Sequence, residues 1–258
     1  MITPRILIVA GSDSGGGAGI QADIKTVTML GGHAMTAITA ITAQNTLGVH
    51  GVLPVPAEMV LAQIDAVVSD IGVDAVKIGM IGSAETAHAV ADRLEQVGVP
   101  IVFDPVMVAT SGAALADAET IAAFDRLMRL ASVVTPNVAE LEALGGDALA
   151  ERLGCTLLAK GGDAPGDVIV DRLLNGSGEL ARWSDERIST RHTHGTGCTL
   201  ASAIAVGLAR GDDLIKSIVR ARRFVHAALK AAPGFGGGHG PMGHALGAVP
   251  FETIQKRS

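Results

Sequence analysis

Short apolar runs that end in glycine, aspartate or proline recur along this chain, and they constrain its fold more than any other feature. Five of them are RILIVAG, DAVKIG, PIVFDP, SVVTPN and TLLAKGG, and most lead into a segment with helical spacing of apolar residues. Continuous rather than alternating hydrophobicity is typical of strands covered on both faces. The pattern therefore predicts βαβ units, with a mostly parallel central sheet between two layers of helices.

One stretch departs from this alternation. Residues 167–184 contain an Asn175-Gly176 step, which is typical of a hairpin turn and predicts a small antiparallel patch at an edge of the sheet. We find no internal repeat and no low-complexity linker, so residues 1–258 are predicted to form a single α/β domain. The periodicity predicts helices over residues 19–30, 56–72, 83–98, 118–131, 198–210 and 212–231.

Composition and charge argue against several classes of function. The chain has five phenylalanines, one tryptophan and no tyrosine, so it lacks the stacking rings of a single-stranded nucleic-acid platform. Its formal charge of -6 argues against any nucleic-acid partner, which needs a basic face. A phosphate site in this chain must therefore be local.

Cysteine usage and hydropathy bear on the compartment. Cys155 and Cys198 are too few for a disulfide framework or a four-cysteine zinc site, which indicates a reducing environment. The apolar run at the amino terminus is too short for a secretory signal. No stretch reaches the roughly 20 apolar residues that a membrane span needs. We therefore expect a soluble, cytoplasmic protein with no membrane partner.

The first of two glycine-rich loops lies in GSDSGGGAGIQAD, residues 11–23. Its Gly17, Gly19 and Ala22 satisfy the dinucleotide fingerprint G-x-G-x-x-A. The following strand ends in Gln44 rather than in the acidic residue that would bind a ribose hydroxyl, so dinucleotide binding is not favoured. A tight strand-to-helix turn explains the same glycines. No G-x-x-x-x-G-K-[ST] motif occurs, which argues against a P-loop ATPase.

The second loop is HGTGC, residues 194–198, at the start of an apolar segment. Backbone N–H groups at a helix start are unpaired and lie at the positive end of the helix dipole, which suits an anion. The spacing fits a phosphate cradle over residues 195–198. It fits equally a glycine turn before a core helix, with Cys198 as a small buried hydrophobe. His192, His194 and Cys198 lack a fourth ligand at suitable spacing, so a zinc site is not favoured.

A set of motifs in a fixed order carries a family resemblance over nearly the whole chain. The motifs are GSDSGGGAGIQAD, TAITAQNTLGV, VKIGMIG, FDPVM, TPNVAE, KGG, HTHGTGCTL and GGHGPMGH. Together they resemble the hydroxymethylpyrimidine/phosphomethylpyrimidine kinases of thiamine biosynthesis, a branch of the ribokinase-like superfamily. The resemblance implies a three-layer kinase, a homodimer, that uses ATP and Mg²⁺. Its expected substrates are 4-amino-5-hydroxymethyl-2-methylpyrimidine and the monophosphate, which becomes the diphosphate.

By this resemblance Gln44 contacts the pyrimidine ring. Its amide offers a donor and an acceptor in one plane, which suits the amino-nitrogen edge of an aminopyrimidine. From the residues alone, a strand-end amide bonded to loop backbone is the simpler interpretation. The other residues implied to line the substrate pocket are Asp23, Gly11, Ala18, Met80 and Val106, although Met80 and Val106 would also fit an ordinary core.

The catalytic residues are also implied by the resemblance. Cys198 stands where most of the superfamily has an aspartate base, and Gly195, Thr196 and Gly197 hold the phosphate beside it. A helix N-terminus lowers a thiol pKa, whereas an incoming phosphate opposes the thiolate. Lys160 is expected to place positive charge against the transferring phosphate and to contact the nucleotide, with a snorkelling strand-end lysine as the alternative.

Metal binding is expected at the carboxyl ends of two further strands. Asn137 and Glu140 form N-x-x-E, which predicts a helix capping box. The resemblance places both near Mg²⁺ and its waters, with Asn137 also contacting the nucleotide, as Thr196 does. Asp104 is a further candidate for the metal region, although an aspartate before proline also starts turns.

Two departures from the family pattern and two alternatives stay open. Ser14 and Gly15 replace a common proline and serine, so the first loop is expected to be more mobile, and the stretch 140–160 is shorter than usual. A pyridoxal kinase of the same fold is one alternative, because one amide does not exclude that ring. A non-catalytic metabolite-binding sensor is the other, and the joint presence of Asn137, Glu140, Lys160 and Cys198 argues against it.

Overall fold

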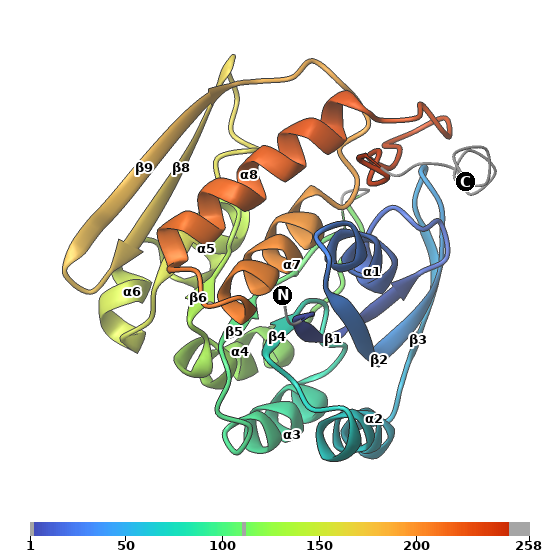
Figure 1. The fold of residues 1–258 in the computed structure, drawn as a ribbon, viewed down its shortest axis with the longest axis vertical. Helices are drawn as coiled ribbons and strands as arrows, with labels where there is room; N and C mark the ends of the chain where they lie inside the picture. Colours follow the sequence, from blue (N-terminus) through green and yellow to red (C-terminus); the bar gives the residue numbers. More distant parts are fainter. Residues whose placement is uncertain (1–2, 110–111, 248–258) are drawn as a thin grey trace, which may run out of the picture.

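The computed structural model describes residues 3–109 and 112–247, which fold around one nine-stranded sheet (Figure 1). In space the strands follow the order β3-β2-β1-β4-β5-β6-β7-β8-β9. Their bounds are β1 (Arg5–Asp13), β2 (His33–Gln44), β3 (Val49–Pro54), β4 (Ala75–Ile78), β5 (Ile101–Phe103), β6 (Val133–Val134), β7 (Leu157–Ala159), β8 (Val168–Asn175) and β9 (Gly178–Glu186).

The centre of this sheet is parallel and both of its edges are antiparallel. Each neighbouring pair from β2 through β7 runs parallel, as the continuous apolar runs predicted. The hairpin of β8 and β9 turns after Asn175 and forms the predicted antiparallel patch. The other edge strand, β3, pairs antiparallel with β2 and was not predicted. The mostly parallel α/β fold expected from the sequence is therefore confirmed.

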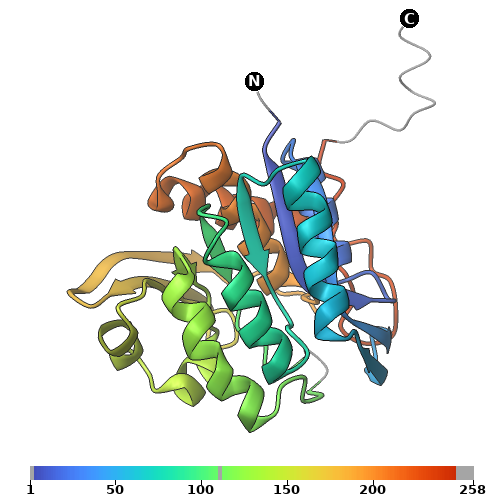
Figure 2. The same ribbon diagram turned by 90° about the horizontal axis from the view of Figure 1, so that it is seen from below.

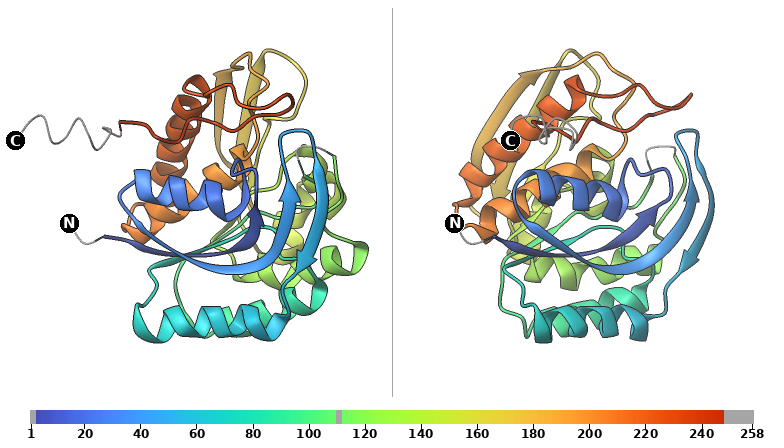
Figure 3. Two further views of the ribbon diagram at one scale, coloured as in Figure 1. Left: turned by 90° about the vertical axis from the view of Figure 1, so that its right-hand side faces the viewer. Right: turned by 45° about the vertical axis from the view of Figure 1, so that its right-hand side comes forward.

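Two layers of helices cover the sheet. The helices α1, α7 and α8 lie on one face, and α2, α3 and α4 lie on the other (Figures 2 and 3). All six helices expected from periodicity are present; α7 begins at Thr196, before its predicted start at residue 198, and the other five are slightly shorter than predicted. The bounds are α1 (Gly19–Met29), α2 (Ala57–Asp70), α3 (Ala84–Leu94), α4 (Ala118–Leu130), α5 (Val138–Leu144), α6 (Ala148–Leu153), α7 (Thr196–Ala209) and α8 (Leu214–Lys230).

Strand β1 separates two hydrophobic cores. Leu7 and Val9 pack into the core under α2, α3 and α4, whereas Ile6 and Ile8 pack into the core under α1, α7 and α8. Successive side chains of a strand point to opposite faces, so an apolar run such as RILIVAG satisfies both cores. Helix α7 is buried along most of its length, which explains its nearly uniform hydrophobicity.

Parallel strands bring the loops that follow them to one edge of the sheet. At this edge, the backbone of Lys160 after β7 pairs with the segment after β6, where Lys160 N–H donates to Pro136 O at 2.9 Å. The motifs after β1, β2, β5, β6 and β7 therefore meet near the start of α7. Within the described residues, no helix is long and apolar enough to cross a membrane.

Candidate active site

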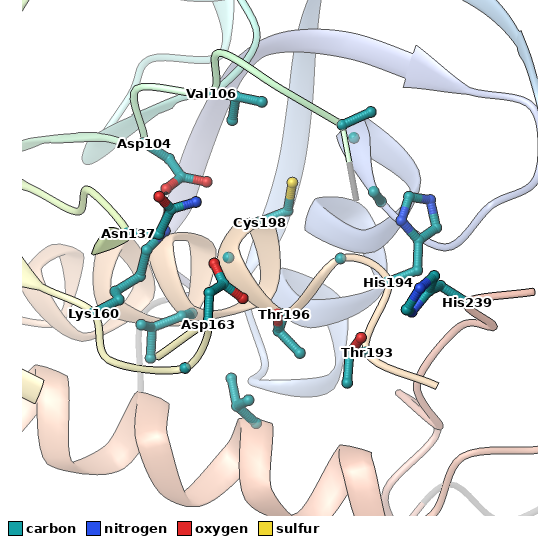
Figure 4. Close-up of a pocket in the computed structure, with 18 of the residues that line it drawn as sticks. Asp104, Val106, Asn137, Lys160, Asp163, Thr193, His194, Thr196, Cys198 and His239 are labelled. Carbon is teal, nitrogen blue, oxygen red and sulfur yellow. Dashed lines mark hydrogen bonds and ion pairs between the residues drawn. The ribbon is translucent and has the colours of Figure 1, made fainter. Parts of the chain in front are cut away.

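A cavity of about 780 Å³ opens where these loops meet the start of α7. One side is formed by polar loop residues, and the other by the β8–β9 hairpin and helix α8. Cys198 stands near its centre, with its sulfur pointing into the cavity between Asp104 and His194 (Figure 4). The residues predicted from the sequence that line it are Gly11, Ala18, Gln44, Met80, Val106, Asp104, Asn137, Glu140, Lys160, Gly195, Thr196, Gly197 and Cys198.

Asp23 is the exception among the predicted site residues. It was expected to line the substrate pocket, but its side chain is fully buried in α1 and is not part of the cavity wall. One carboxylate oxygen accepts from Lys77 Nζ at 2.8 Å, and the other accepts from Ser202 Oγ at 2.7 Å. The prediction for Asp23 is therefore corrected: both oxygens are taken up by buried protein groups.

The first glycine loop is held in place by Asp13, which the sequence analysis missed. Its carboxylate accepts the N–H groups of Gly15 at 2.8 Å, Gly17 at 3.0 Å and Ala18 at 2.8 Å. Burial opposes ionisation, but the hydrogen bonds from His194 and from these amides outweigh it and lower the pKa of Asp13. The loop is therefore an anchored turn around a carboxylate.

The end of the cavity expected to hold the pyrimidine contains Gln44 and Met80. Gln44 Nε2 lies 3.2 Å from His194 Nε2, and Thr42 Oγ1 donates to Gln44 Oε1 at 3.2 Å, so the amide has a fixed orientation. A Cβ on Gly11 would lie 2.5 Å from Met80 Cε, so only glycine lets that methyl group lie against the strand. A planar amide beside a flexible thioether suits a flat, polar-edged ring.

Ser14, one of the departures from the family pattern, ties the first loop to this end of the cavity. Its hydroxyl donates to Gln44 O and accepts from Gln44 N–H, both at 2.8 Å. The serine therefore fixes the strand end that carries the amide. The mobility expected of the loop from Ser14 and Gly15 stays a prediction.

The second glycine loop reaches the start of α7 through Gly195. This residue has a φ of 86°, and a Cβ placed on it would lie only 1.9 Å from Gly17 O. The first helical bond runs from Thr199 N–H to Gly195 O at 2.9 Å. The N–H groups of the first helical turn consequently have no acceptor within the helix. Thr196 N–H donates to Thr193 O at 3.3 Å, before the helix, whereas Gly197 and Cys198 lie at the cavity wall. This is the geometry of an anion-binding helix start.

Replacing Gly195 with alanine is expected to destabilise the protein by roughly 3 kcal/mol, because a left-handed backbone and a backbone clash combine. Gly211 supplies the matched control: it has a φ of 80°, and a Cβ there would meet nothing within 4 Å. Gly211→Ala should therefore cost only about 1 to 2 kcal/mol for the backbone alone. Urea unfolding measures both, and equal losses would contradict the close approach of the two glycine loops.

Lys160 and Asp104 form an ion pair on the sheet side of the cavity. Lys160 Nζ lies 2.7 Å from Asp104 Oδ1, and Thr135 Oγ1 donates to the same oxygen at 2.8 Å. Burial opposes both charges, but each ion stabilises the other, so the pKa of Asp104 is lowered and that of Lys160 is raised. A Cβ on Gly197 would lie 3.1 Å from Lys160 Nζ, so the ammonium group faces the start of α7.

Asn137 and Glu140 form the predicted capping box at the start of α5. Glu140 N–H donates to Asn137 Oδ1 at 2.9 Å, and Asn137 N–H donates to Glu140 Oε2 at 2.8 Å. Burial raises the pKa of Glu140 to about 7. The charge of Lys160 opposes this rise, and the charge of Asp104 adds to it. The carboxyl group is therefore protonated part of the time at neutral pH.

This raised pKa predicts a pH-dependent stability. Because the folded state keeps the Glu140 proton up to about pH 7 and the unfolded chain loses it near 4.5, the contribution of Glu140 to stability is fully present below about pH 4.5 and is lost as pH rises to about 7. The shift corresponds to about 3 kcal/mol. Glu140→Gln keeps the capping acceptor but cannot titrate. Between pH 5 and 8, urea unfolding should show that the unmodified protein loses more unfolding free energy than Glu140→Gln does. The same pH dependence of the unfolding free energy in both proteins would contradict this prediction.

Cys198 differs from the expectation based on its place at a helix start. Burial raises the pKa of its thiol to about 11, and the charges of Asp23 and Asp104 add to this. Lys77 and the backbone N–H of Gly19 act in the opposite direction but do not outweigh burial. The expected lowering is thus wrong for the protein without ligands, and the thiol form dominates at neutral pH.

The far side of the cavity, along the hairpin and α8, was not predicted as part of a site. Its wall mixes apolar side chains, Ile169, Ile188, Val225 and Leu229, with charged ones such as Glu186 and Arg187. At its border Arg222 is paired with Asp171 and Asp185 and lies 5.8 Å from the centre of the Trp183 ring. No local motif marks these residues, because the cavity wall forms only when the hairpin folds back over α8.

A three-layer α/β fold, with a glycine-led helix start beside a lysine and a carboxylate in one cavity, is the arrangement of a phosphotransferase of the ribokinase-like class. Residues 13–243 match the family model described as phosphomethylpyrimidine kinase. The chain belongs to this family.

Two similar proteins of known name agree with this assignment. The chain is 48% identical to the hydroxymethylpyrimidine/phosphomethylpyrimidine kinase of Rhizobium meliloti, over 94% of this chain and 97% of that protein. It is also 48% identical to the thiamine biosynthesis bifunctional protein ThiED of Geobacter sulfurreducens, but spans only 52% of that longer protein.

Solved structures agree on the fold. The pyridoxal kinase from Staphylococcus aureus in complex with AMP-PCP and pyridoxal superposes with a TM-score of 0.85 at 30% identity, over 96% of this chain and 95% of that one. The phosphomethylpyrimidine kinase from Clostridium difficile superposes with a TM-score of 0.75 at 36% identity, over 88% and 99%.

Proposed function

We propose that the protein transfers the γ-phosphate of ATP to 4-amino-5-hydroxymethyl-2-methylpyrimidine, and then phosphorylates the monophosphate to the diphosphate. One observation carries this proposal: a single cavity has an oriented amide, Gln44, at one end and an ion pair with an anion-binding helix start at the other. The kinase relative from Rhizobium meliloti, at 48% identity, supports a pyrimidine rather than a pyridoxal substrate, because the pyridoxal kinase from Staphylococcus aureus is only 30% identical.

In this proposal the hydroxymethyl oxygen attacks the γ-phosphorus while the bond from that phosphorus to the bridging oxygen of ADP breaks. In molecules whose Cys198 is a thiolate, the sulfur, which points into the cavity at the start of α7, accepts the hydroxyl proton and becomes the thiol. With a thiol pKa of about 11, the thiolate is a minor form at pH 7. Proton removal by a base contributes little to the rate of phosphoryl transfer, because the transition state is loose and the attacking oxygen is only weakly bonded to phosphorus. Positioning and charge neutralisation therefore carry most of the rate.

Mg²⁺ is proposed as the metal that accompanies ATP. Asn137, Glu140 and Asp104 present the oxygen donors that Mg²⁺ prefers, and the raised pKa of Glu140 marks a carboxyl group whose ionised form would gain from a nearby cation. No group of three or more histidine, cysteine or acidic side chains poised for a metal occurs among the described residues. A metal held mainly by phosphates and waters fits such a sparse donor set. When bound, it would neutralise charge on the phosphates.

We further propose that the protein is a homodimer, as the family resemblance implies, and that it acts in the cytoplasm, as its cysteine usage and hydropathy indicate. Light scattering on a size-exclusion column tests the first, with a mass twice the 26.1 kDa of one chain as the expected result. A monomer at all concentrations would contradict it.

ADP release with Mg-ATP tests the proposed function. The acceptors are the hydroxymethylpyrimidine, its monophosphate, pyridoxal and ribose. We expect turnover with both pyrimidines and a lower kcat/KM for pyridoxal. A preference for pyridoxal would replace the substrate assignment, and binding of the pyrimidine without ADP release would favour a sensor.

A further inference from the structure

A buried ion pair lies at the wall of the cavity, with only one of its two members in the lining. Lys77 is in the middle of β4 and Asp23 is in α1, and both side chains have 0% exposure. Lys77 Nζ and Asp23 Oδ2 are 2.8 Å apart, and Ser202 of α7 donates to the other carboxylate oxygen at 2.7 Å. Three separate elements thus meet at one pair of charges.

A buried ion pair of this kind usually contributes little to the stability of a fold. The desolvation of two buried ions usually cancels their attraction, and an apolar pair of similar size is often as stable or more so. Strand β4 is otherwise apolar, so another aliphatic side chain at position 77 would continue its pattern. A Cβ on Gly79 would lie 2.7 Å from Lys77 Nζ, so the chain also leaves room for the ammonium group. These features call for a role other than stability.

The position of Lys77 suggests that role. Lys77 lines the cavity, whereas its partner Asp23 does not. Ser202, which bonds to the same Asp23, lies one helical turn after Cys198 on the same face of α7. The ammonium charge of Lys77 acts on two cavity groups, Cys198 and Asp104. Burial alone would lower the pKa of Lys77, but the surrounding negative groups, Asp23 first, raise it above its usual value. The positive charge is therefore permanent and fixed in place.

We propose that Lys77 is a positioning residue for phosphoryl transfer: held by Asp23, it keeps a fixed positive charge in the wall of the cavity into which the sulfur of Cys198 points, and this charge favours negative charge on the sulfur. This inference rests on the proposed function and extends it to a residue outside the predicted site. Asp23 acts through Lys77, because its own oxygens are taken up by Lys77 and Ser202.

The charged groups around Cys198 set the expected signs. Lys77 of β4 favours the thiolate, and Lys160 after β7 interacts with the sulfur in the same sense. Asp23 of α1 and Asp104 after β5 oppose the thiolate, while the backbone N–H of Gly19 favours it. Among these charges the effect of Lys77 is the largest, so removing Lys77 and Asp23 together should still disfavour the thiolate.

The test measures alkylation of Cys198 by iodoacetamide between pH 7 and 9, with the modified peptide identified by mass spectrometry. Lys77→Met should slow alkylation about tenfold or more, the size of effect that one nearby charge has. Asp23→Asn should speed it. The double variant Lys77→Met/Asp23→Asn, which leaves no unpaired buried ion, should be slower than the unmodified protein and faster than Lys77→Met alone.

The double variant decides the outcome even if either single variant fails to fold. If the pair only stabilises the fold, the double variant will alkylate and turn over like the unmodified protein, and this result overturns the proposal. If Lys77 acts on Cys198, alkylation and kcat both fall in the double variant while KM for the pyrimidine changes little. Lys216→Met, at an exposed lysine of α8, removes one positive charge and should change neither.

Alkylation requires no substrate, so its result is independent of the proposed function. If the unmodified protein releases ADP with none of the acceptors, the proposed function is refuted. Slower alkylation of the double variant would still show that Lys77 acts on the sulfur of Cys198. Normal alkylation of the double variant, in a protein that phosphorylates the pyrimidine, would refute the role of Lys77 alone.

Discussion

Cys198→Ala is expected to slow turnover roughly 10²- to 10⁴-fold, the range typical of a group that takes part in proton transfer. Its sulfur points into the cavity at the start of α7, where the substrate hydroxyl and the transferring phosphate are proposed to meet. Because the thiol pKa is about 11, the loss should lie nearer the low end of this range at pH 7 and increase as the pH rises. Initial rates of ADP release at saturating pyrimidine and Mg-ATP measure the effect.

Cys155 provides the matched control for this variant. It is also a cysteine, but it is buried in the core under α2, α3 and α4 and is not part of the cavity. Cys155→Ala should lower stability by removing a packed side chain and leave kcat per folded molecule unchanged. Near-normal turnover of Cys198→Ala would remove the sulfur from the reaction, and an equal loss in both variants would point to a packing effect.

Lys160→Met is expected to lower kcat about 10²- to 10³-fold, as the loss of one charge-stabilising group at a reaction centre does. Methionine nearly matches the length of lysine but carries no charge. The ammonium group now lies 2.7 Å from Asp104 Oδ1 and faces Gly197 at the helix start, so it is placed to counter the charge of a phosphate bound there. KM for the pyrimidine should change little, because Gln44 lies at the other end of the cavity.

Steady-state kinetics on folded protein measure this prediction, with Lys216→Met as the control for the loss of a positive charge. Lys216 is exposed at the start of α8 and lies outside the cavity. An unchanged kcat for Lys160→Met would mean that the phosphate binds elsewhere. A rise in KM for the pyrimidine with normal kcat would instead place Lys160 at the substrate end.

The fold was largely predictable because its main signals are local. Runs such as RILIVAG are apolar on both faces of the strand, and helix periodicity gives the outer layers directly. The hairpin was found because a two-residue turn signal lies between two strands. Strand β3 was missed because nearly all of its residues, Val49–Pro54, are exposed, so no burial pattern marks it as a strand.

The site was predictable where a motif is contiguous. Asn137 and Glu140 were expected to form a capping box, and they do, because this interaction needs only a spacing of three residues. Asp23 and Lys77 were not paired in advance, because their contact joins residues 54 positions apart. The pKa of Cys198 was expected to fall because a helix start acts locally. Burial and the charges of Asp23 in α1 and Asp104 after β5 depend on tertiary structure, and together they raise the pKa of Cys198.

A structure of the protein with hydroxymethylpyrimidine and the non-hydrolysable ATP analogue AMP-PCP would test the central claim most directly. We expect the γ-phosphate within hydrogen-bond distance of Lys160 Nζ and of N–H groups at the start of α7, with the hydroxymethyl oxygen facing the sulfur of Cys198. A phosphate bound away from residues 195–198, or a pyrimidine away from Gln44, would contradict the account.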